Sequence, residues 1–213
     1  MQGVTSRPQS AARRKPAEER RSEIVSTASD IALAEGLDSL TLRRVADELG
    51  VFPGLVNHYY PAVDDLVAAA FGEDAAAELD EIFALVDEER TPLERMRRLL
   101  VSLVSEERDG ISLLWLDALQ AARRRPALRA ELTAQMLAWQ TRVTALIDEG
   151  IAAGVFRARD SDAVAVRILA MIDGLSVQAA IRSAIDYAAV REMVFASTER
   201  ELGLRSGKLH PPR

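Results

Sequence analysis

Helix-breaking residues are few in this sequence. The 213 residues include 8 prolines, 11 glycines and 35 alanines. Between the breakers, apolar side chains recur every three or four residues, the spacing that places them on one face of an α-helix. Alanine has the highest helix propensity, and no stretch shows the strict alternation of a half-buried strand. The sequence therefore predicts an all-α protein.

Composition argues against several kinds of site. Cysteine is absent, which excludes disulfides, thiolate catalysis and cysteine-bound zinc. The two histidines, His58 and His210, are far apart in sequence, so we expect no metal site and no cofactor. No apolar run reaches the length of about 18 residues that a membrane helix requires, and the N-terminus lacks the apolar core of a signal peptide. We therefore expect a cytoplasmic protein with no membrane partner.

Charge is distributed unevenly along the chain. The net charge is −6, yet residues 1–21 carry six basic groups and two acidic groups. Such asymmetry allows a nucleic-acid-facing N-terminal end on an otherwise acidic protein. We interpret residues 1–15 as a disordered basic arm. It either neutralises phosphates or serves only as a solubilising terminus.

The most specific pattern is the stretch TLRRVADELGVFPGLVNHYY, which begins at Thr41. Thr41 suits the N-cap of a helix over 42–49, and a glycine ends that helix. Pro53 suits the first turn of a second short helix, which Pro61 stops. Two short helices joined by a tight turn are typical of a helix-turn-helix, whose second helix lies in the DNA major groove. The alternative is an ordinary helical hairpin, but that would not need the polar-tipped aromatics at its end.

These residues strongly resemble the TetR family of transcriptional regulators. The similarity covers roughly residues 20–70. Within this range it is carried by the stretch from Ile24 to Gly36, by the two short helices, and by the H-Y-Y-P run that leads into Asp65 and Leu66. In that family, three N-terminal helices bind DNA, and the later helices bind an effector and dimerise.

The resemblance implies a division of the chain into four parts. These are a basic arm at 1–15, a helix-turn-helix domain at 16–62, an effector-binding and dimerisation domain at 63–203, and a flexible tail at 204–213. It also implies a ligand-responsive repressor that binds a palindromic operator in double-stranded DNA as a homodimer and is released by a small-molecule effector.

An enzyme and a protein-binding adaptor are the alternatives to a regulator. An enzyme is disfavoured because the sequence has no nucleophile elbow, phosphate-binding glycine loop, zinc-protease motif or dinucleotide fingerprint. A helical adaptor that binds only protein is a third class. Binding to duplex DNA would separate a regulator from both.

The resemblance implies DNA contacts from both short helices. Base or groove contacts are implied for Pro53, Gly54, Leu55, Asn57 and His58. Phosphate contacts are implied for Thr41, Arg43 and Tyr59. Tyr60 is a further phosphate candidate, but we favour it as an aromatic plug beneath the first and fourth helices.

Three positions depart from the family pattern. Phe52 stands where a small polar cap is common, Asn57 where an aromatic is usual, and Val63 where a basic residue is usual. Asn57 either reads adenine, whose N6 and N7 an asparagine can bind together, or is simply exposed.

Dimerisation is expected from the helices near 127–152 and 162–185. The second is apolar around most of its circumference, so it should be buried on most sides. One face would pack on the chain's own core and the other on a second subunit.

An effector cavity is expected near Trp115, in a region similar to the subgroup of choline and betaine-pathway repressors. The region holds more bulky side chains than three helices need to pack on one another, so some of them could line a cavity. A buried carboxylate needs a partner, which would favour a cationic or hydrogen-bond-donating ligand. Each candidate is alternatively a core or surface residue. The candidates are Met96, Leu100, Trp115, Asp117, Gln120, Met136, Trp139 and Met171.

Overall fold

The computed structural model describes residues 16–179 and 187–210, so the expected basic arm at 1–15 lies outside the described residues. Within this part of the chain the regular structure is entirely helical, which confirms the predicted fold class. None of the described helices is long and apolar enough to cross a membrane. The α-helices are α1 (Ala17–Glu35), α2 (Leu42–Leu49), α3 (Pro53–Tyr59), α4 (Val63–Asp87), α5 (Pro92–Leu103), α6 (Asp109–Ala121), α7 (Pro126–Ala152), α8 (Ser161–Ala179) and α9 (Tyr187–Glu201), with single 3-10 turns η1 (Leu37–Ser39) and η2 (Glu106–Arg108).

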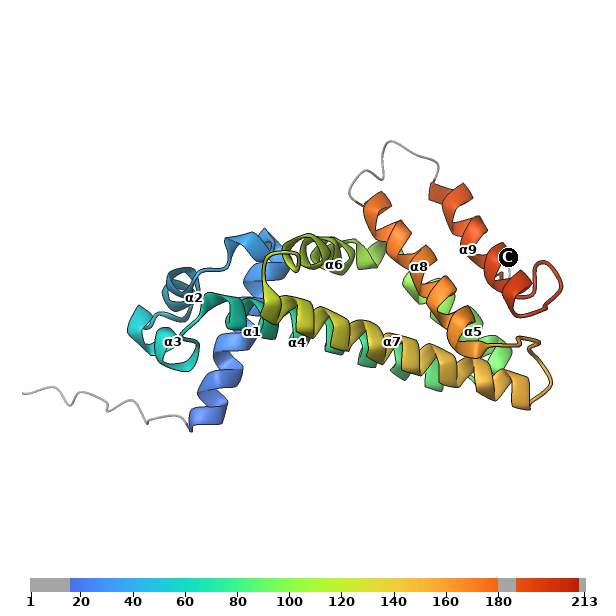
Figure 1. Ribbon diagram of the computed structural model, residues 1–213, viewed down its shortest axis with the longest axis horizontal. Helices are drawn as coiled ribbons and strands as arrows, with labels where there is room; N and C mark the ends of the chain where they lie inside the picture. Colours follow the sequence, from blue (N-terminus) through green and yellow to red (C-terminus); the bar gives the residue numbers. More distant parts are fainter. Residues whose placement is uncertain (1–15, 180–186, 211–213) are drawn as a thin grey trace, which may run out of the picture.

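The molecule is elongated, with α1, α2 and α3 at one end (Figure 1). Helix α4 leaves this end and runs beneath the rest of the protein, where α7 packs along it. Helix α1 packs on the start of α4, and α6 contacts both α1 and α4. Helices α4 and α6 therefore both connect the larger end of the molecule to the helix-turn-helix end.

Local signals place the helix ends where the sequence predicts them. The Thr41 hydroxyl accepts a hydrogen bond from the Arg44 amide at 3.0 Å and caps α2. Gly50 ends α2 with a left-handed backbone (φ 64°), which favours glycine. Prolines occupy the first turn of α3, α5 and α7, where the missing N–H has no helical partner. The predicted helix at 162–185 is described only to Ala179, and its remainder lies outside the described residues.

Tyr60 belongs to the core rather than to the DNA-facing surface. Its ring is buried, and the Arg21 guanidinium of α1 lies 4.8 Å from the ring centroid. Val45, Ala46 and Val56 are also buried, so α2 and α3 share a small apolar core. The prediction that Tyr60 is an aromatic plug is therefore confirmed.

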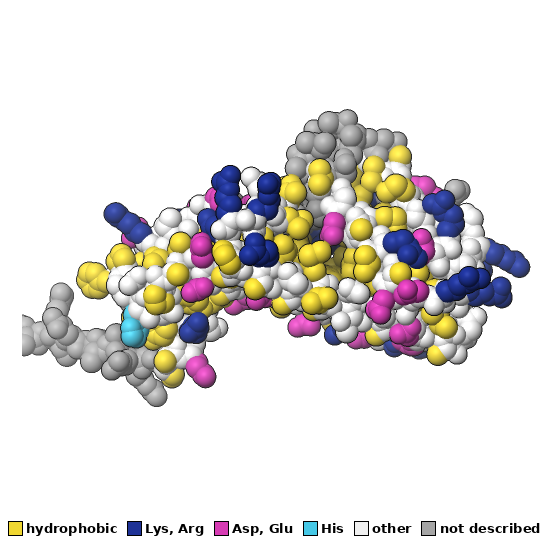
Figure 2. Space-filling view, in the orientation of Figure 1, with side chains coloured by type: hydrophobic (Ala, Val, Ile, Leu, Met, Phe, Trp, Pro, Cys, Tyr) yellow, Lys and Arg dark blue, Asp and Glu magenta, His cyan; other side chains and the backbone are white. Residues whose placement is uncertain are grey.

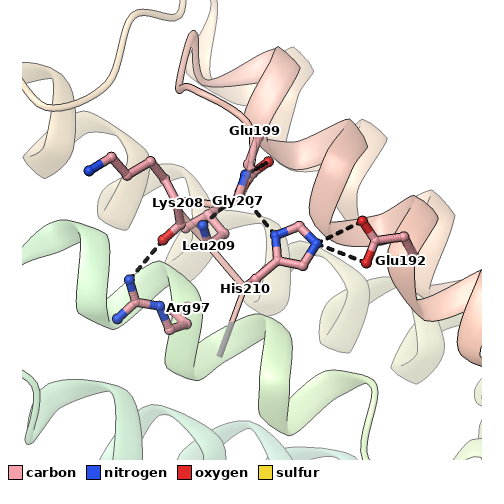
Figure 3. A network of polar contacts seen from close by, with 7 residues as sticks. All are labelled: Arg97, Glu192, Glu199, Gly207, Lys208, Leu209 and His210. Carbon is pink, nitrogen blue, oxygen red and sulfur yellow. Dashed lines mark hydrogen bonds and ion pairs between the residues drawn. The ribbon is translucent and has the colours of Figure 1, made fainter. Parts of the chain in front are cut away.

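The C-terminal segment is not the flexible tail that was expected at 204–213. The Glu199 carboxylate is buried and accepts hydrogen bonds from the amides of Gly207 at 2.9 Å and Leu209 at 2.7 Å (Figure 3). The Arg97 guanidinium donates to the Lys208 carbonyl at 2.7 Å, and the Leu209 side chain is fully buried. The reason is that a buried carboxylate needs donors, and this segment supplies two backbone N–H groups. Residues 211–213 lie outside the described residues.

His210 adds a pH-dependent contact to this segment. Its Nε2 lies 2.8 Å from the Glu192 carboxylate and its Nδ1 lies 3.4 Å from Glu199. The hydrogen bond with Glu192 is the main cause that raises the pKa of His210 above its ordinary value of 6.5. Because the folded pKa is raised, the ion pairs stabilise the fold fully below pH 6.5 and weaken as pH rises through the folded pKa.

We predict that His210→Ala lowers the melting temperature more at pH 6 than at pH 9. A part of the loss should persist at high pH, since the imidazole also packs against Phe195 at a centroid distance of 5.3 Å. Differential scanning calorimetry across pH 5.5–9 measures this difference. Glu192→Gln serves as the matched control and should reduce the pH dependence in the same way. Parallel pH curves for the wild type and His210→Ala would show that the imidazole charge has no role.

Candidate DNA-binding and effector sites

Helix α3 presents most of the predicted base-contacting residues to solvent at the end of the molecule (Figure 1). Pro53, Gly54, Asn57 and His58 are exposed, whereas Leu55 is half-buried. The buried face of this helix is supplied by Val56. The exposed face is therefore free of any part in the core and is available to a groove of DNA.

Two adjacent arginines of α2 have different environments. The Arg43 side chain is 84% exposed, and its nearest acidic group, Asp47, lies 3.7 Å away. Arg44 instead binds Glu35 of α1 at 2.7 Å and Glu48 at 2.6 Å, so it holds α2 to α1. Arg43 is therefore the arginine of this pair that can reach a phosphate.

The remaining predicted contacts surround these two helices. Tyr59 is half-buried, and its ring meets His58 edge to face at 5.3 Å. The Thr41 hydroxyl serves as the cap of α2 and remains exposed. Phe52 is 88% exposed, and α3 has no side-chain cap at its N-terminus, as its departure from the family pattern suggests.

A pocket lies beside Trp115, between α4, α6, α7 and α8. We call it the Trp115 pocket; its volume of about 60 Å³ is room for about four to six waters, so a larger ligand would require its walls to move. Figure 2 shows apolar side chains gathered around the hollow between α6, α7 and α8. Three predicted residues line the pocket together with residues that the sequence analysis did not select. The lining consists of Glu78, Leu103, Arg108, Trp115, Met136, Trp139, Leu169, Ile172 and Asp173.

A buried polar network forms one wall of the Trp115 pocket. The Arg108 guanidinium donates to Glu78 at 2.6 Å and to the Leu103 carbonyl at 3.0 Å. The Trp115 indole N–H donates to the other oxygen of Glu78 at 2.9 Å, and its ring packs edge to face on Phe71. Glu78 is thus held by two donors, which fix the orientation of both the arginine and the indole.

Asp173 of α8 supplies a second carboxylate to the Trp115 pocket. Burial of the carboxyl group by the surrounding protein raises the pKa of Asp173, and the positive charge of Arg108 opposes that rise. The side chain still keeps contact with solvent. Arg108 balances the charge of Glu78, so Asp173 leaves the pocket with one excess negative charge beside two indole rings, which suits a small organic cation.

Asp117 and Gln120 do not face the Trp115 pocket, contrary to expectation. Both are exposed and line a separate hollow near the turn between α6 and α7. The reason is helix geometry: at about 100° per residue, positions two and five after Trp115 are rotated by about 200° and about 140° away from it. The Asp117 carboxylate instead approaches Gly36, where it lies 3.0 Å from the point that a Cβ would occupy.

The α6–α7 turn attaches this end of the molecule to the helix-turn-helix end. Arg125 lies 3.5 Å from Asp38 of η1 and 3.6 Å from Asp64 at the start of α4. Asp117 and Gln120 therefore belong to a junction between the two ends and not to the Trp115 pocket.

Three other predicted pocket residues serve in packing. Met96 and Leu100 are fully buried on α5 and do not line the pocket. Met171 is half-buried on α8 and also lies away from the pocket lining. The sequence analysis missed Glu78, because α4 carries eight acidic residues and no local signal distinguishes this buried one from the others.

We predict that Glu78→Leu lowers the free energy of unfolding by about 3–5 kcal/mol, because it removes the carboxylate that pairs with the largely buried Arg108 charge and leaves only the Leu103 carbonyl. Glu78→Gln keeps an acceptor for Trp115 and should cost less. Urea unfolding at one protein concentration measures these changes. Glu48→Ala is the control, since it breaks an exposed pair with Arg44 and should cost less than about 1 kcal/mol.

The double variant Glu78→Leu/Arg108→Leu tests whether the unpaired Arg108 charge causes the loss of stability in Glu78→Leu. It removes both charges, so it should recover much of the stability lost in Glu78→Leu. A loss in Glu78→Leu no greater than in Glu48→Ala would contradict the importance of the buried pair.

The chain is similar to known transcriptional regulators along most of its length. A family model for the C-terminal region of BetI-type transcriptional repressors matches residues 92–203, which is more than half of the chain. The HTH-type transcriptional regulator PksA of Bacillus subtilis (strain 168) is 24% identical over 164 residues, covering 76% of this chain and 79% of that protein.

Solved structures show the same fold. A TetR transcription regulator from Haloarcula marismortui is 25% identical with a TM-score of 0.72, covering 87% of this chain and 97% of that chain. A transcriptional regulator from Saccharomonospora viridis, solved in complex with choline, is 23% identical with a TM-score of 0.73, covering 87% of this chain and 98% of that chain.

The helix-turn-helix geometry and the family match lead to the same conclusion, and they identify a DNA-binding regulator rather than an enzyme. The chain belongs to the TetR family of transcriptional regulators, with a C-terminal region of the BetI type.

Proposed function

We propose that this protein is a repressor that is released from its operator by a small organic cation bound in the Trp115 pocket. The observation that carries the proposal is the Asp173 carboxylate beside two indole rings in one pocket, where Arg108 already balances the charge of Glu78. The choline complex of the Saccharomonospora viridis regulator supports a quaternary ammonium as the class of ligand. Residues 16–62 would bind DNA in the cytoplasm, and residues 63–203 would bind the effector and dimerise.

We infer a homodimer that reads a palindromic operator. Val166, Ala170 and Val177 lie on one exposed face of α8 at helical spacing, and Leu137 is exposed on α7. Apolar side chains on one face are best covered by a second subunit. Two-fold symmetry would then present two α3 helices to the two halves of a palindrome.

Helix α4 is the proposed route from effector to DNA. Glu78 forms a wall of the Trp115 pocket, and one turn earlier Asp74 accepts a hydrogen bond from Ser29 of α1 at 2.5 Å. A ligand that shifts Glu78 would move α4 against α1 and change the separation of the two α3 helices. This requires the ligand to bind the non-DNA state more tightly than the DNA-bound state.

We predict salt-dependent binding to a palindrome in the DNA upstream of the coding sequence. With about six phosphate contacts per dimer, log K should fall with log salt with a slope of about −5. Arg43→Ala and Tyr59→Ala should weaken binding to all sequences alike, whereas Asn57→Ala should change the preference at one base pair. Fluorescence anisotropy with labelled duplexes measures each of these effects.

The control for this experiment is Arg142→Ala, which removes a positive charge near Asp87, at the far end of α4 from the helix-turn-helix. It should leave the salt slope unchanged. No binding to the upstream DNA, or a flat salt response, would contradict the proposal. An unchanged base preference in Asn57→Ala would remove the readout role of that residue.

We predict that choline quenches the intrinsic fluorescence and weakens operator binding together. Both tryptophans of the chain line the pocket, so the emission reports on that site. The neutral isostere 3,3-dimethylbutan-1-ol has the same shape without the charge and should bind at least about tenfold more weakly. Asp173→Asn should weaken choline binding and leave the isostere unaffected. Equal binding of the two compounds would contradict recognition of a cation.

A further inference from the structure

A second and larger hollow lies on the other side of the Glu78–Arg108 ion pair. These two residues line both the Trp115 pocket and this hollow, whose volume is about 730 Å³. That volume falls in the range of small-molecule sites in proteins. Its walls come from α4, α5, η2 and α9, together with Leu33 of α1 and Ile111 of α6. It therefore touches the helix-turn-helix end directly, which the Trp115 pocket does not.

One buried carboxylate oxygen in this hollow has no donor. Asp74 is 9% exposed, and its Oδ1 accepts the hydrogen bond from Ser29. Its Oδ2 is buried and has no hydrogen-bond partner among the residues that the structure describes. A buried carboxylate oxygen left without a donor is costly, because it has lost its water without a replacement. Asp74 lines the hollow, so a small rotation of its carboxylate would bring Oδ2 to a donor on a ligand there.

The charges around Asp74 favour a positive ligand. Five carboxylates line the hollow, namely Asp74, Glu78, Glu81, Glu106 and Glu107, against the three arginines Arg98, Arg108 and Arg191. Arg108 is neutralised by Glu78, and Arg98 binds Glu89 at 2.9 Å. The apolar part of the wall includes Leu33, Ile82, Val101 and Phe195. The hollow thus combines an excess of negative charge with apolar surface.

From this geometry we propose that the hollow, which we call the Asp74 site, binds a protonated alkyl amine whose N–H donates to Asp74 Oδ2. The apolar body of the amine lies against Leu33, Ile82 and Phe195. A quaternary ammonium has no N–H to donate, so this ligand class differs from the one proposed for the Trp115 pocket. The amine would bind the same carboxylate whose other oxygen accepts from Ser29, which connects the site to α1.

The experiment uses the full-length protein and isothermal titration calorimetry at pH 7.5. The probe is hexylamine, and the controls are the neutral 1-hexanol and the quaternary hexyltrimethylammonium. Hexylamine should bind Asp74→Asn at least about tenfold more weakly than wild type, since the variant lacks the charge that strengthens the hydrogen bond. Equal binding of hexylamine and hexanol, or equal binding to wild type and a folded Asp74→Asn, overturns the proposal.

Two controls separate this site from the Trp115 pocket. Asp173→Asn should weaken choline binding and leave hexylamine binding unchanged, and saturating choline should not displace hexylamine. Competition between them for one site overturns the proposal even if Asp74→Asn fails to fold. Ser29→Ala removes the donor to Oδ1 and leaves Oδ2 free, so it should bind hexylamine at least as tightly as wild type.

The effect on DNA is read separately and rests on the proposed repressor function. Hexylamine should change operator affinity in wild type, and this change should be smaller in Ser29→Ala, which has already lost the contact from Asp74 to α1. If choline fails to bind while hexylamine binds through Asp74, the Trp115 proposal fails and the Asp74 site stands. The opposite result removes the Asp74 site alone.

Discussion

The buried ion pair between Glu78 and Arg108 organises the larger end of the molecule. It joins the middle of α4 to η2, and the Trp115 indole N–H completes the set of donors to Glu78. Two buried charges are tolerable only when paired and hydrogen-bonded, so this contact fixes the relative positions of three elements. Glu78 and Arg108 also line both hollows, so the two hollows share this ion pair as a common wall.

Helix α4 connects that pair to the helix-turn-helix without a flexible joint. Asp74 and Glu78 are one turn apart, and the first contacts Ser29 of α1 while the second contacts Trp115 of α6. On the opposite side, Arg125 lies near both Asp38 and Asp64 at the same junction. A rigid helix held at both ends transmits a small displacement more directly than a linker would.

Features that depend on neighbouring residues were predictable, and features that depend on distant ones were not. The capping threonine, the prolines and the glycines act within one turn, so the helix-turn-helix and most helix ends could be read from the sequence. The pocket assignment of Asp117 was wrong because two positions after Trp115 a side chain points to the opposite face of the helix, and Glu78 was missed because its partner lies 30 residues away. Burial of Leu209 depends on Glu199, whose carboxylate has no local signature in the sequence.

Few side chains of α3 are buried, which affects how readily its sequence can change. Of its seven residues, Val56 is the one that is buried, so the outward positions carry almost no folding energy. Under the proposed role of α3, substitutions at Asn57 or His58 would change which DNA is read while the protein's stability stays nearly constant. The proposed operator preference would then drift with little loss of folding energy, whereas Val56 is constrained by packing.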